Sequence, residues 1–331
     1  MIAALGVSMR PWVITAGLAA FTATAPVAAQ GLIPLDPVTE SPGESGNEAG
    51  AQQLSFQPDA YERMTVPVQI AGQGPYRFLV DTAADRTSIS HELATKLMLK
   101  RGGTTRLHSI AGMTSVGTAI IPLLELSRVR IELIHAPMLD RARIGADGIL
   151  GVDSLRSQRV SFDFKANTLT IVPGASRLVA EDEGTIVVRA KRRNGRLLLS
   201  RASADGISLT IVPDTGSQVS MGNEALRRAL ERRGLIRTVG GMQLTGVTGA
   251  TLGGHSVLIN RLEIGGIVLN NLEIAFANVR TFDQLKLNQR PALLLGMNAI
   301  GAFERVSIDF ANKKLRLKMP RSASAESAAI R

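Results

Sequence analysis

The body of this chain carries the same series of short motifs twice, in the same order. The segment Phe78–Ala84, an apolar run that ends in Asp-Thr-Ala-Ala, has a counterpart in Thr210–Ser217, which ends in Asp-Thr-Gly-Ser. Two further pairs follow: Gly148–Asp153 with Ala292–Asn298, and Arg159–Phe164 with Arg305–Phe310. The offset between the copies drifts from 133 residues in the first pair to 146 in the last. Such a pattern is typical of two homologous lobes whose loops differ in length.

Both copies consist mainly of short β-type runs. Stretches of Val, Ile, Thr and Leu bounded by Gly, Pro, Asn or Asp predict strands. In the first copy we expect them at Met64–Ile70, Tyr76–Val80, Thr118–Leu124, Val129–Ile134, Ser161–Phe164 and Thr168–Val172. Two short helices are expected at equivalent places, His91–Lys100 capped by Ser90 and Glu224–Arg233 capped by Asn223. The predicted fold class is mostly β, with an internal duplication about a pseudo-twofold axis and short helices.

The first 29 residues have the layout of a secretory signal peptide. Arg10 precedes the apolar run Pro11–Ala25, and small residues at Val27–Ala29 suit a cleavage site. An uncleaved membrane anchor is the alternative. We therefore expect an exported protein, periplasmic or secreted, with no stable membrane span after cleavage.

The remaining chain divides by composition. Residues 30–53 are rich in Pro, Gly and acids and predict a flexible lead. The two lobes are expected at 54–180 and 181–320, followed by a disordered tail at 321–331. Because both lobes lie in one chain, we expect a monomer.

Asp81 and Asp214 are the candidate reactive residues, since each ends an apolar strand at the same place in its copy. Two carboxylates held together by a pseudo-twofold axis do not both ionise easily, so the pair holds one proton. The ionised member can take a proton from water while the protonated member polarises a carbonyl. This chemistry needs no thiol, and the chain has no cysteine. The four histidines are scattered, so neither a metal nor another cofactor is expected.

With these motifs the chain resembles the aspartic proteases, specifically bacterial retropepsin-like members with two lobes in one chain. Leu79–Thr87 is similar to the retropepsin signature, and Ile211–Ser217 to the pepsin-type version. Ile149–Gly151 and Leu294–Gly296 resemble the hydrophobic-hydrophobic-Gly segments that cross behind each catalytic loop. The resemblance covers roughly residues 54–319 and implies a two-lobed acid-protease fold with a cleft between the lobes.

The resemblance also implies roles for individual residues. Asp81 and Asp214 would form the catalytic dyad, and Asp85 would hold the substrate backbone. Mobile flaps would fall near Leu107–Gly117 and Leu244–Gly253, neither of which contains a tyrosine. The loop residues that would support the dyad are Thr82, Ala83, Ala84, Thr215, Gly216 and Ser217, and the flap residues that would contact substrate are Gly112 and Gly249.

Ala83 stands where the family has glycine, and this leaves the function open. If the backbone there needs a positive φ, the methyl group costs about 1–2 kcal/mol. If it needs only room, the methyl group crowds the dyad or its water. The alternatives are an active aspartic endopeptidase, a non-catalytic pseudo-protease that binds peptides, and a processing factor for one dedicated exported partner.

The formal net charge of +10 does not identify a partner. The basic run Lys191–Arg196 is either an anion site or, as its Asn-Gly turn favours, a solvated hairpin tip. Arginines 227, 228, 232 and 233 are expected on the wet side of their helix. Asp153 and Asn298 are expected to cap helices, and Asp163 and Asp309 to be structural. Aromatic residues are not interleaved with the basic ones, so we expect no nucleic-acid partner and a polypeptide substrate.

Overall fold

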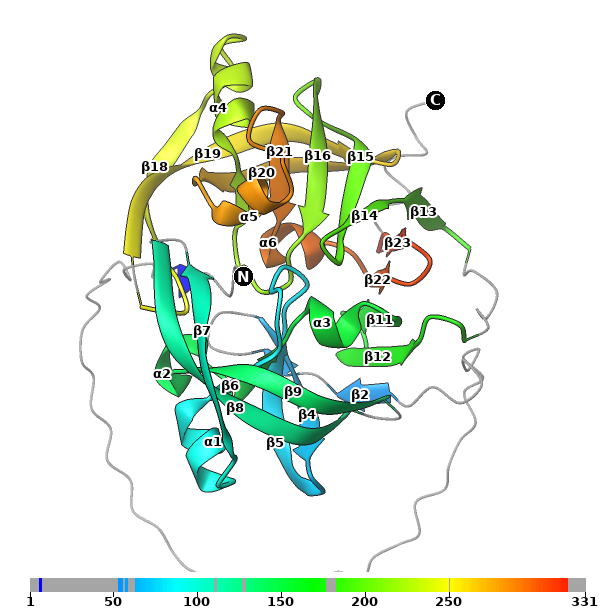
Figure 1. Cartoon of the computed structure of the whole chain (residues 1–331). Helices are drawn as coiled ribbons and strands as arrows, with labels where there is room; N and C mark the ends of the chain where they lie inside the picture. Colours follow the sequence, from blue (N-terminus) through cyan, green and yellow to red (C-terminus); the bar gives the residue numbers. More distant parts are fainter. Residues whose placement is uncertain are drawn as a thin grey trace, which may run out of the picture.

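The computed structural model describes residues 6–7, 53–55, 57–58, 63–109, 112–126, 129–176, 183–249 and 251–320. The expected signal peptide, lead and tail lie outside these residues, apart from the two-residue strand β1 (Gly6–Val7) and Gln53. The expected boundary between the lobes, after residue 180, also falls outside them. The chain forms two lobes that lie above and below a third, smaller sheet in Figure 1.

An eight-stranded sheet forms the first lobe, in the order β3-β4-β5-β10-β6-β9-β8-β7. Its strands are β3 (Gln57–Pro58), β4 (Met64–Ile70), β5 (Gln73–Val80), β6 (Ser88–Ser90), β7 (Arg101–Ser109), β8 (Gly112–Leu126), β9 (Val129–Leu139) and β10 (Gly148–Leu150). The strands predicted between residues 64 and 134 are confirmed. Strands β8 and β9 extend beyond the predicted ends because they form one long hairpin with each other.

The second lobe repeats this arrangement in a nine-stranded sheet, ordered β1-β18-β19-β20-β17-β21-β16-β15-β14. Its strands after β1 are β14 (Lys191–Arg193), β15 (Arg196–Ala204), β16 (Ile207–Pro213), β17 (Ser220–Gly222), β18 (Thr238–Thr245), β19 (Thr251–Ile264), β20 (Ile267–Phe276) and β21 (Ala292–Leu295). Asn194 and Gly195 join β14 to β15 with φ of 47° and 82°. This confirms the predicted Asn-Gly hairpin turn, which needs positive φ at both residues.

A six-stranded sheet joins the two lobes, in the order β13-β23-β22-β11-β12-β2. Its strands are β2 (Gln53–Ser55), β11 (Gln158–Asp163), β12 (Thr168–Pro173), β13 (Thr185–Arg189), β22 (Arg305–Asp309) and β23 (Lys314–Lys318). The repeated strands β11 and β22 pair antiparallel at its centre, with Ser161 opposite Ser307. The third motif of the repeat is therefore the junction of the lobes.

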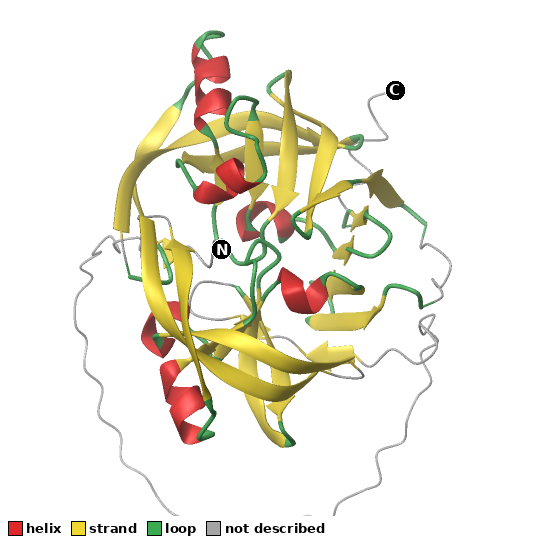
Figure 2. Cartoon of the chain, in the orientation of Figure 1, coloured by secondary structure: helices red, strands yellow, loops and turns green. Residues whose placement is uncertain are grey.

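The described helices are short and cover the sheets at equivalent places (Figure 2). They are α1 (His91–Lys96), α2 (Arg141–Ile144), α3 (Val152–Leu155), α4 (Glu224–Glu231), α5 (Arg280–Gln284) and α6 (Met297–Ile300). Both predicted caps are confirmed, since Ser90 Oγ accepts from Leu93 N at 3.1 Å and Asn223 Oδ1 accepts from Leu226 N at 2.9 Å.

Helices α1 and α4 end earlier than predicted. Met98 and Gly234 take a left-handed φ after the last turn, and the next amide in each case donates five residues back, to Ala94 O and Leu230 O. This geometry closes a helix by satisfying its last carbonyl groups.

The core is aliphatic, and one buried cluster extends through both lobes and the sheet between them. Within the described residues, no helix is long and apolar enough to cross a membrane.

Candidate active site

Asp81 and Asp214 follow directly on the two strands that the repeat places in equivalent positions. Strand β5 ends at Val80 and pairs parallel with β10, while β16 ends at Pro213 and pairs parallel with β21. The last carbonyl group of each crossing strand then accepts the aspartate amide. Asp81 N donates to Leu150 O at 3.0 Å, and Asp214 N donates to Leu295 O at 2.9 Å. The hydrophobic-hydrophobic-Gly segments thus lie beside the two Asp-Thr loops.

The two aspartates are buried and interact electrostatically. Asp81 is 0% exposed and Asp214 is 1% exposed. Burial, followed by the charge of Asp81, raises the pKa of Asp214 well above its ordinary value, against weaker opposing effects of Gly216 and Arg196. Like charges in a site of low dielectric constant favour a pair that holds one proton. The ionisation of Asp214 therefore depends on the charge of Asp81.

Thr82 and Thr215 tie the two catalytic loops together. Thr82 Oγ1 donates to Pro213 O at 2.9 Å, and Thr215 Oγ1 donates to Val80 O at 2.7 Å. In return, each hydroxyl oxygen accepts the backbone amide of the other threonine at 3.2 Å. All four hydrogen bonds cross between the lobes. A hydroxyl group is needed at both positions because each both donates and accepts.

The hydrogen bonds to the two carboxylates are not symmetric. Asp81 Oδ1 accepts the amides of Ala83 and Ala84 at 2.8 and 2.9 Å. Asp214 Oδ1 accepts the amide of Gly216 at the longer distance of 3.1 Å, and the backbone of Ser217 adds a weaker hydrogen bond to this carboxyl group. Hydrogen bonds to the charged form stabilise it. This geometry therefore favours negative charge on Asp81.

The backbone at Ala83 does not need the conformational freedom of glycine. Neither Ala83 nor its counterpart Gly216 has a positive φ. The first of the two costs considered for the methyl group therefore does not arise. Room is the issue in the second lobe, because a Cβ on Gly216 would lie 2.3 Å from Cγ of Asp81. Ala83 carries its methyl group fully buried at the equivalent place in the first lobe.

The remaining loop residues form hydrogen bonds that hold the two loops in place. Ala84 O accepts the amide of Val152 at 2.9 Å, which joins the first loop to helix α3. Ser217 Oγ donates to Val219 O at 2.8 Å within the second loop.

Asp85 forms an ion pair with Arg196, a buried residue that the sequence predicts to be exposed. Arg196 Nη2 lies 2.8 Å from Asp85 Oδ1, and Gln284 Nε2 donates to Asp85 Oδ2 at 3.3 Å. Burial acts to raise the pKa of Asp85, but the Arg196 guanidinium and further contacts outweigh it and lower that pKa. The prediction that Arg196 belongs to a solvated hairpin tip is wrong, because its side chain is 0% exposed. Its neighbours Lys191–Asn194 are exposed, as predicted.

Arg196 has a counterpart in the first lobe. Arg63 lies 18 residues before Asp81, as Arg196 lies 18 before Asp214, and it is 1% exposed. Arg63 Nη2 donates to Ile144 O at 2.7 Å. The repeat offset of 133 residues was the signal that could have identified this pair. The pair was missed because local composition says nothing about partners that lie far away in the chain.

The predicted flaps are hairpins of the two large sheets, β7–β8 and β18–β19. Gly112 begins β8, opposite Ser109, while Gly249 lies in the turn of the second hairpin with φ of 78°. The second turn rests on the first lobe. Val247 is 2% exposed within an apolar cluster of first-lobe residues, and Arg143 Nη1 donates to Thr248 O.

Asp153 and Asn298 are not helix caps, which corrects the prediction. They lie inside the first turns of α3 and α6, where Gly151 and Gly296 are the capping residues. Asp153 Oδ1 accepts from the amide and the hydroxyl of Thr87, both at 2.8 Å. Asn298 Oδ1 accepts from the amide and hydroxyl of Ser220 at 2.9 and 2.8 Å. Both therefore hold the segment that follows a catalytic loop.

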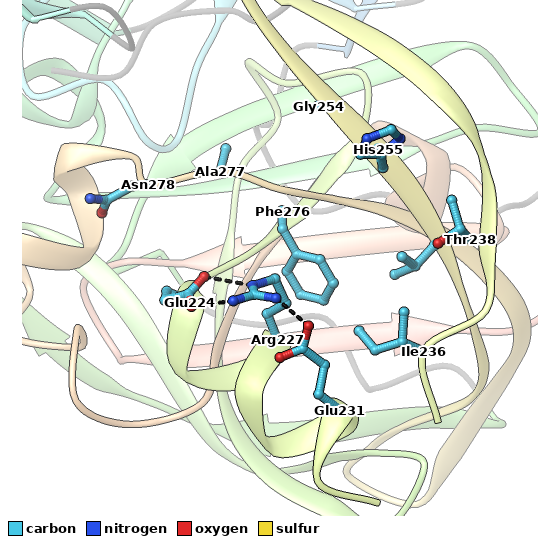
Figure 3. Close-up of a pocket in the computed structure, with 11 residues that line it drawn as sticks. Glu224, Arg227, Glu231, Ile236, Thr238, Gly254, His255, Phe276, Ala277 and Asn278 are labelled. Atoms are coloured by element: carbon cyan, nitrogen blue, oxygen red, sulfur yellow. Dashed lines mark hydrogen bonds and ion pairs between the residues drawn. The ribbon is translucent and has the colours of Figure 1, made fainter. Parts of the chain in front are cut away.

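A cavity of about 410 Å³ lies away from the dyad, between α4 and the base of the β18–β19 hairpin (Figure 3). Arg227 is one of the residues that line it, and it pairs along the helix with Glu224 and Glu231. Leu226 and Leu230 are buried, so the predicted inner face of this helix is confirmed. Arg228, Arg232 and Arg233 are exposed, as predicted, and Arg227 is partly exposed. In the described part of the chain, no three His, Asp or Glu side chains gather into a metal site.

Comparison with known proteins agrees with this geometry. A family model described as aspartyl protease matches residues 66–154 and 200–299, which together are more than half of the chain. Each matched stretch contains one of the two Asp-Thr loops and its crossing strand. A search of curated proteins gives no match. The chain belongs to the aspartyl protease family.

Proposed function

We propose that the protein is an aspartic endopeptidase whose catalytic dyad is Asp81 and Asp214. The observation that carries this proposal is the pair of buried, electrostatically coupled carboxyl groups at the ends of equivalent strands. Threonine hydroxyls fix the two loops against each other beneath them. A dyad held in this way meets the geometric demand of general acid–base catalysis before any substrate binds.

The chemistry follows from the proton that the pair shares. The ionised carboxylate takes a proton from a water molecule, which attacks the carbonyl carbon of the scissile peptide bond. The protonated carboxyl donates to the carbonyl oxygen, and the tetrahedral intermediate collapses when the leaving nitrogen receives a proton. No covalent enzyme intermediate forms. The low dielectric constant around Asp81 and Asp214 strengthens each of these interactions.

An extended polypeptide is the substrate that suits this site. Residues Gly6–Val7 pair antiparallel with Leu244–Thr245, at the edge of β18 in the second flap. That edge therefore accepts an added strand, which is how sheets bind extended peptides through main-chain hydrogen bonds. The expected signal peptide supports the further proposal that the substrate is met outside the cytoplasm.

The presence of Ala83 favours a second candidate, a pseudo-protease that binds peptides without cleaving them. A Cβ on Gly216 would lie against Asp81, and by the pseudo-twofold relation we expect the methyl group of Ala83 to lie on the Asp214 side of the dyad. Both candidates require the same arrangement of Asp81 and Asp214. Only catalysis separates the two candidates.

The test is incubation of the protein, freed of residues 1–29, with a random peptide library between about pH 3 and 7. The variants Asp81→Asn and Asp214→Asn keep the side-chain volume but remove a titrating group. We expect cleavage by the wild type and a loss of about 10³-fold or more in each variant. Cleavage that persists in both variants would contradict the dyad. Peptide binding without cleavage would establish the second candidate.

A further inference from the structure

We propose that Arg196 is a positioning residue that keeps the negative charge of the dyad on Asp81. This inference rests on the proposed function, because it concerns how the same two aspartates divide one proton. Arg196 acts through the peptide group between Ala83 and Ala84 and touches neither the substrate nor the reacting atoms.

The guanidinium of Arg196 reaches across the lobe junction to the first catalytic loop. Arg196 begins β15 in the second lobe, immediately after the Asn-Gly turn. Its Nε and Nη2 donate to Ala83 O at 2.9 and 2.5 Å, and Nη2 also contacts Asp85 Oδ1 at 2.8 Å. The Arg196 side chain is fully buried and Asp85 is 32% exposed, so solvent screens the contacts with Ala83 O less than the ion pair with Asp85. A forked guanidinium fixes its acceptors in direction as well as distance.

The peptide group that Arg196 holds is the one that donates to Asp81. Its oxygen, Ala83 O, accepts from the guanidinium, while its N–H group, on Ala84, donates to Asp81 Oδ1 at 2.9 Å. A cation at the oxygen end polarises the peptide and strengthens the hydrogen bond at the nitrogen end. Ala83 N adds a second donor to the same oxygen at 2.8 Å. Arg196 therefore stabilises the ionised form of Asp81 without contacting it.

The second lobe differs at the position equivalent to Asp85. Gln218 stands at the position equivalent to Asp85, so this end of the cleft lacks the carboxylate that orients Arg196. Asp214 Oδ1 accepts the amide of Gly216 at the longer distance of 3.1 Å, and the backbone of Ser217 adds a weaker hydrogen bond to this carboxyl group. The proton of the dyad is accordingly expected on Asp214, whose carboxyl group accepts the longer of these hydrogen bonds.

The charged groups that bear on this division are Asp81, Asp214, Asp85 and Arg196. The direct field of Arg196 also lowers the pKa of Asp214, but burial and the charge of Asp81 outweigh it. Removal of the guanidinium thus weakens the ionised state of the pair as a whole. The first macroscopic ionisation of the dyad then moves to higher pH.

The experiment compares Arg196→Gln with Arg196→Lys, and with Arg192→Gln as the matched control on the exposed tip of the same hairpin. We expect Arg196→Gln to lower kcat by about 10- to 100-fold. The acidic limb of its kcat/KM profile should move up by about one pH unit. Arg196→Lys keeps the charge and loses the fork, so it should fall between Arg196→Gln and the wild type. Arg192→Gln should match the wild type.

A titration that needs no activity separates this inference from the proposed function. The carboxyl carbons of ¹³C-labelled aspartate report the ionisation of the dyad by NMR, and Asp81→Asn and Asp214→Asn assign the signals. We expect the lower dyad pKa to rise in Arg196→Gln and, by less, in Arg196→Lys, whether or not peptides are cleaved. An unchanged titration in a folded Arg196 variant would overturn the inference. A shift of equal size in Arg192→Gln would overturn it as well.

Discussion

Ser161 Oγ donates to Ser307 Oγ at 2.8 Å across the junction of the two lobes. The two serines occupy the same place in the two copies of the repeat and lie directly opposite each other in the register of β11 and β22. The pseudo-twofold axis therefore passes between them. On either side of the axis Arg159 faces Asp309 and Asp163 faces Arg305, so the repeated strand is complementary to itself.

Removal of one serine hydroxyl should lower the free energy of unfolding by more than half as much as removal of both. Ser161→Ala leaves the mostly buried hydroxyl of Ser307 without this partner, which we expect to lower the free energy of unfolding by about 1 kcal/mol. The double variant with Ser307→Ala leaves no such orphan group. Chemical denaturation of the single and double variants gives a coupling energy, expected at about 0.5–1 kcal/mol. Strictly additive losses would show that the hydrogen bond contributes nothing.

Reciprocal substitutions of Ala83 and Gly216 should have unequal effects. Gly216→Ala drives a methyl group to 2.3–2.6 Å from the carboxyl atoms of Asp81, so the loop must shift. We expect a loss of about 1–3 kcal/mol of stability, as for other overpacked sites, together with loss of cleavage. Thermal unfolding and peptide cleavage measure the two effects.

Ala83→Gly is the matched variant. It should lower stability by only about 0.5–1 kcal/mol, the usual cost of glycine in place of alanine. If the methyl group restricts the dyad, cleavage should increase at the same time. Equal cleavage in Ala83→Gly and the wild type would show that the first loop already has the room it needs.

The stability of the protein should fall as the pH rises through the pKa of Asp214. That pKa is raised in the folded state, so the folded protein binds an extra proton between the unfolded value, about 3.9, and the native one. The stabilising contribution is complete at low pH and is lost as Asp214 ionises. Asp214→Asn lacks this titration. We expect the variant to gain stability relative to the wild type as the pH rises above about 4, measured by denaturant unfolding at each pH. A constant difference would contradict the buried, proton-bearing state.

The tip of the second flap should depend on Val247 for its contact with the first lobe. Val247→Ala removes two buried methyl groups. We expect the contact between this turn and the first lobe to become less favourable by about 1–2 kcal/mol. The amide of Gly249, which donates to Gly246 O at 2.8 Å, should then exchange with deuterium more rapidly. Val239→Ala is the control, because Val239 is 57% exposed on β18 of the same hairpin. Equal exchange rates at Gly249 would argue against anchoring by the tip.

The doubled motifs were sufficient to predict the fold, because each describes a local event. An apolar run ending in Asp-Thr, a capping Ser90 or Asn223 and an Asn-Gly turn each determine a few neighbouring dihedral angles, and all were found where expected. The catalytic roles of Asp81 and Asp214 stay a prediction.

What escaped prediction depends on contacts between segments that are far apart in the chain. Arg196 stands in a basic run that looks solvated, and its burial follows only from Ala83 and Asp85, more than 110 residues earlier in the chain. Asp153 was assigned to the wrong local role for a similar reason, since Thr87 comes from a separate loop. Sequence periodicity reports which face of an element is buried, and it does not report which distant group lies against it.

A strand that is complementary to itself does not distinguish its own second copy from the same strand in another molecule. The pairing of β11 with β22 therefore depends on local concentration as well as on sequence. With both copies on one chain, each meets the other at an effective concentration of about millimolar, well above the concentration of any second molecule in dilute solution. Covalent linkage thus determines which partner is chosen, and concentrated refolding is the condition in which lobes exchange between chains.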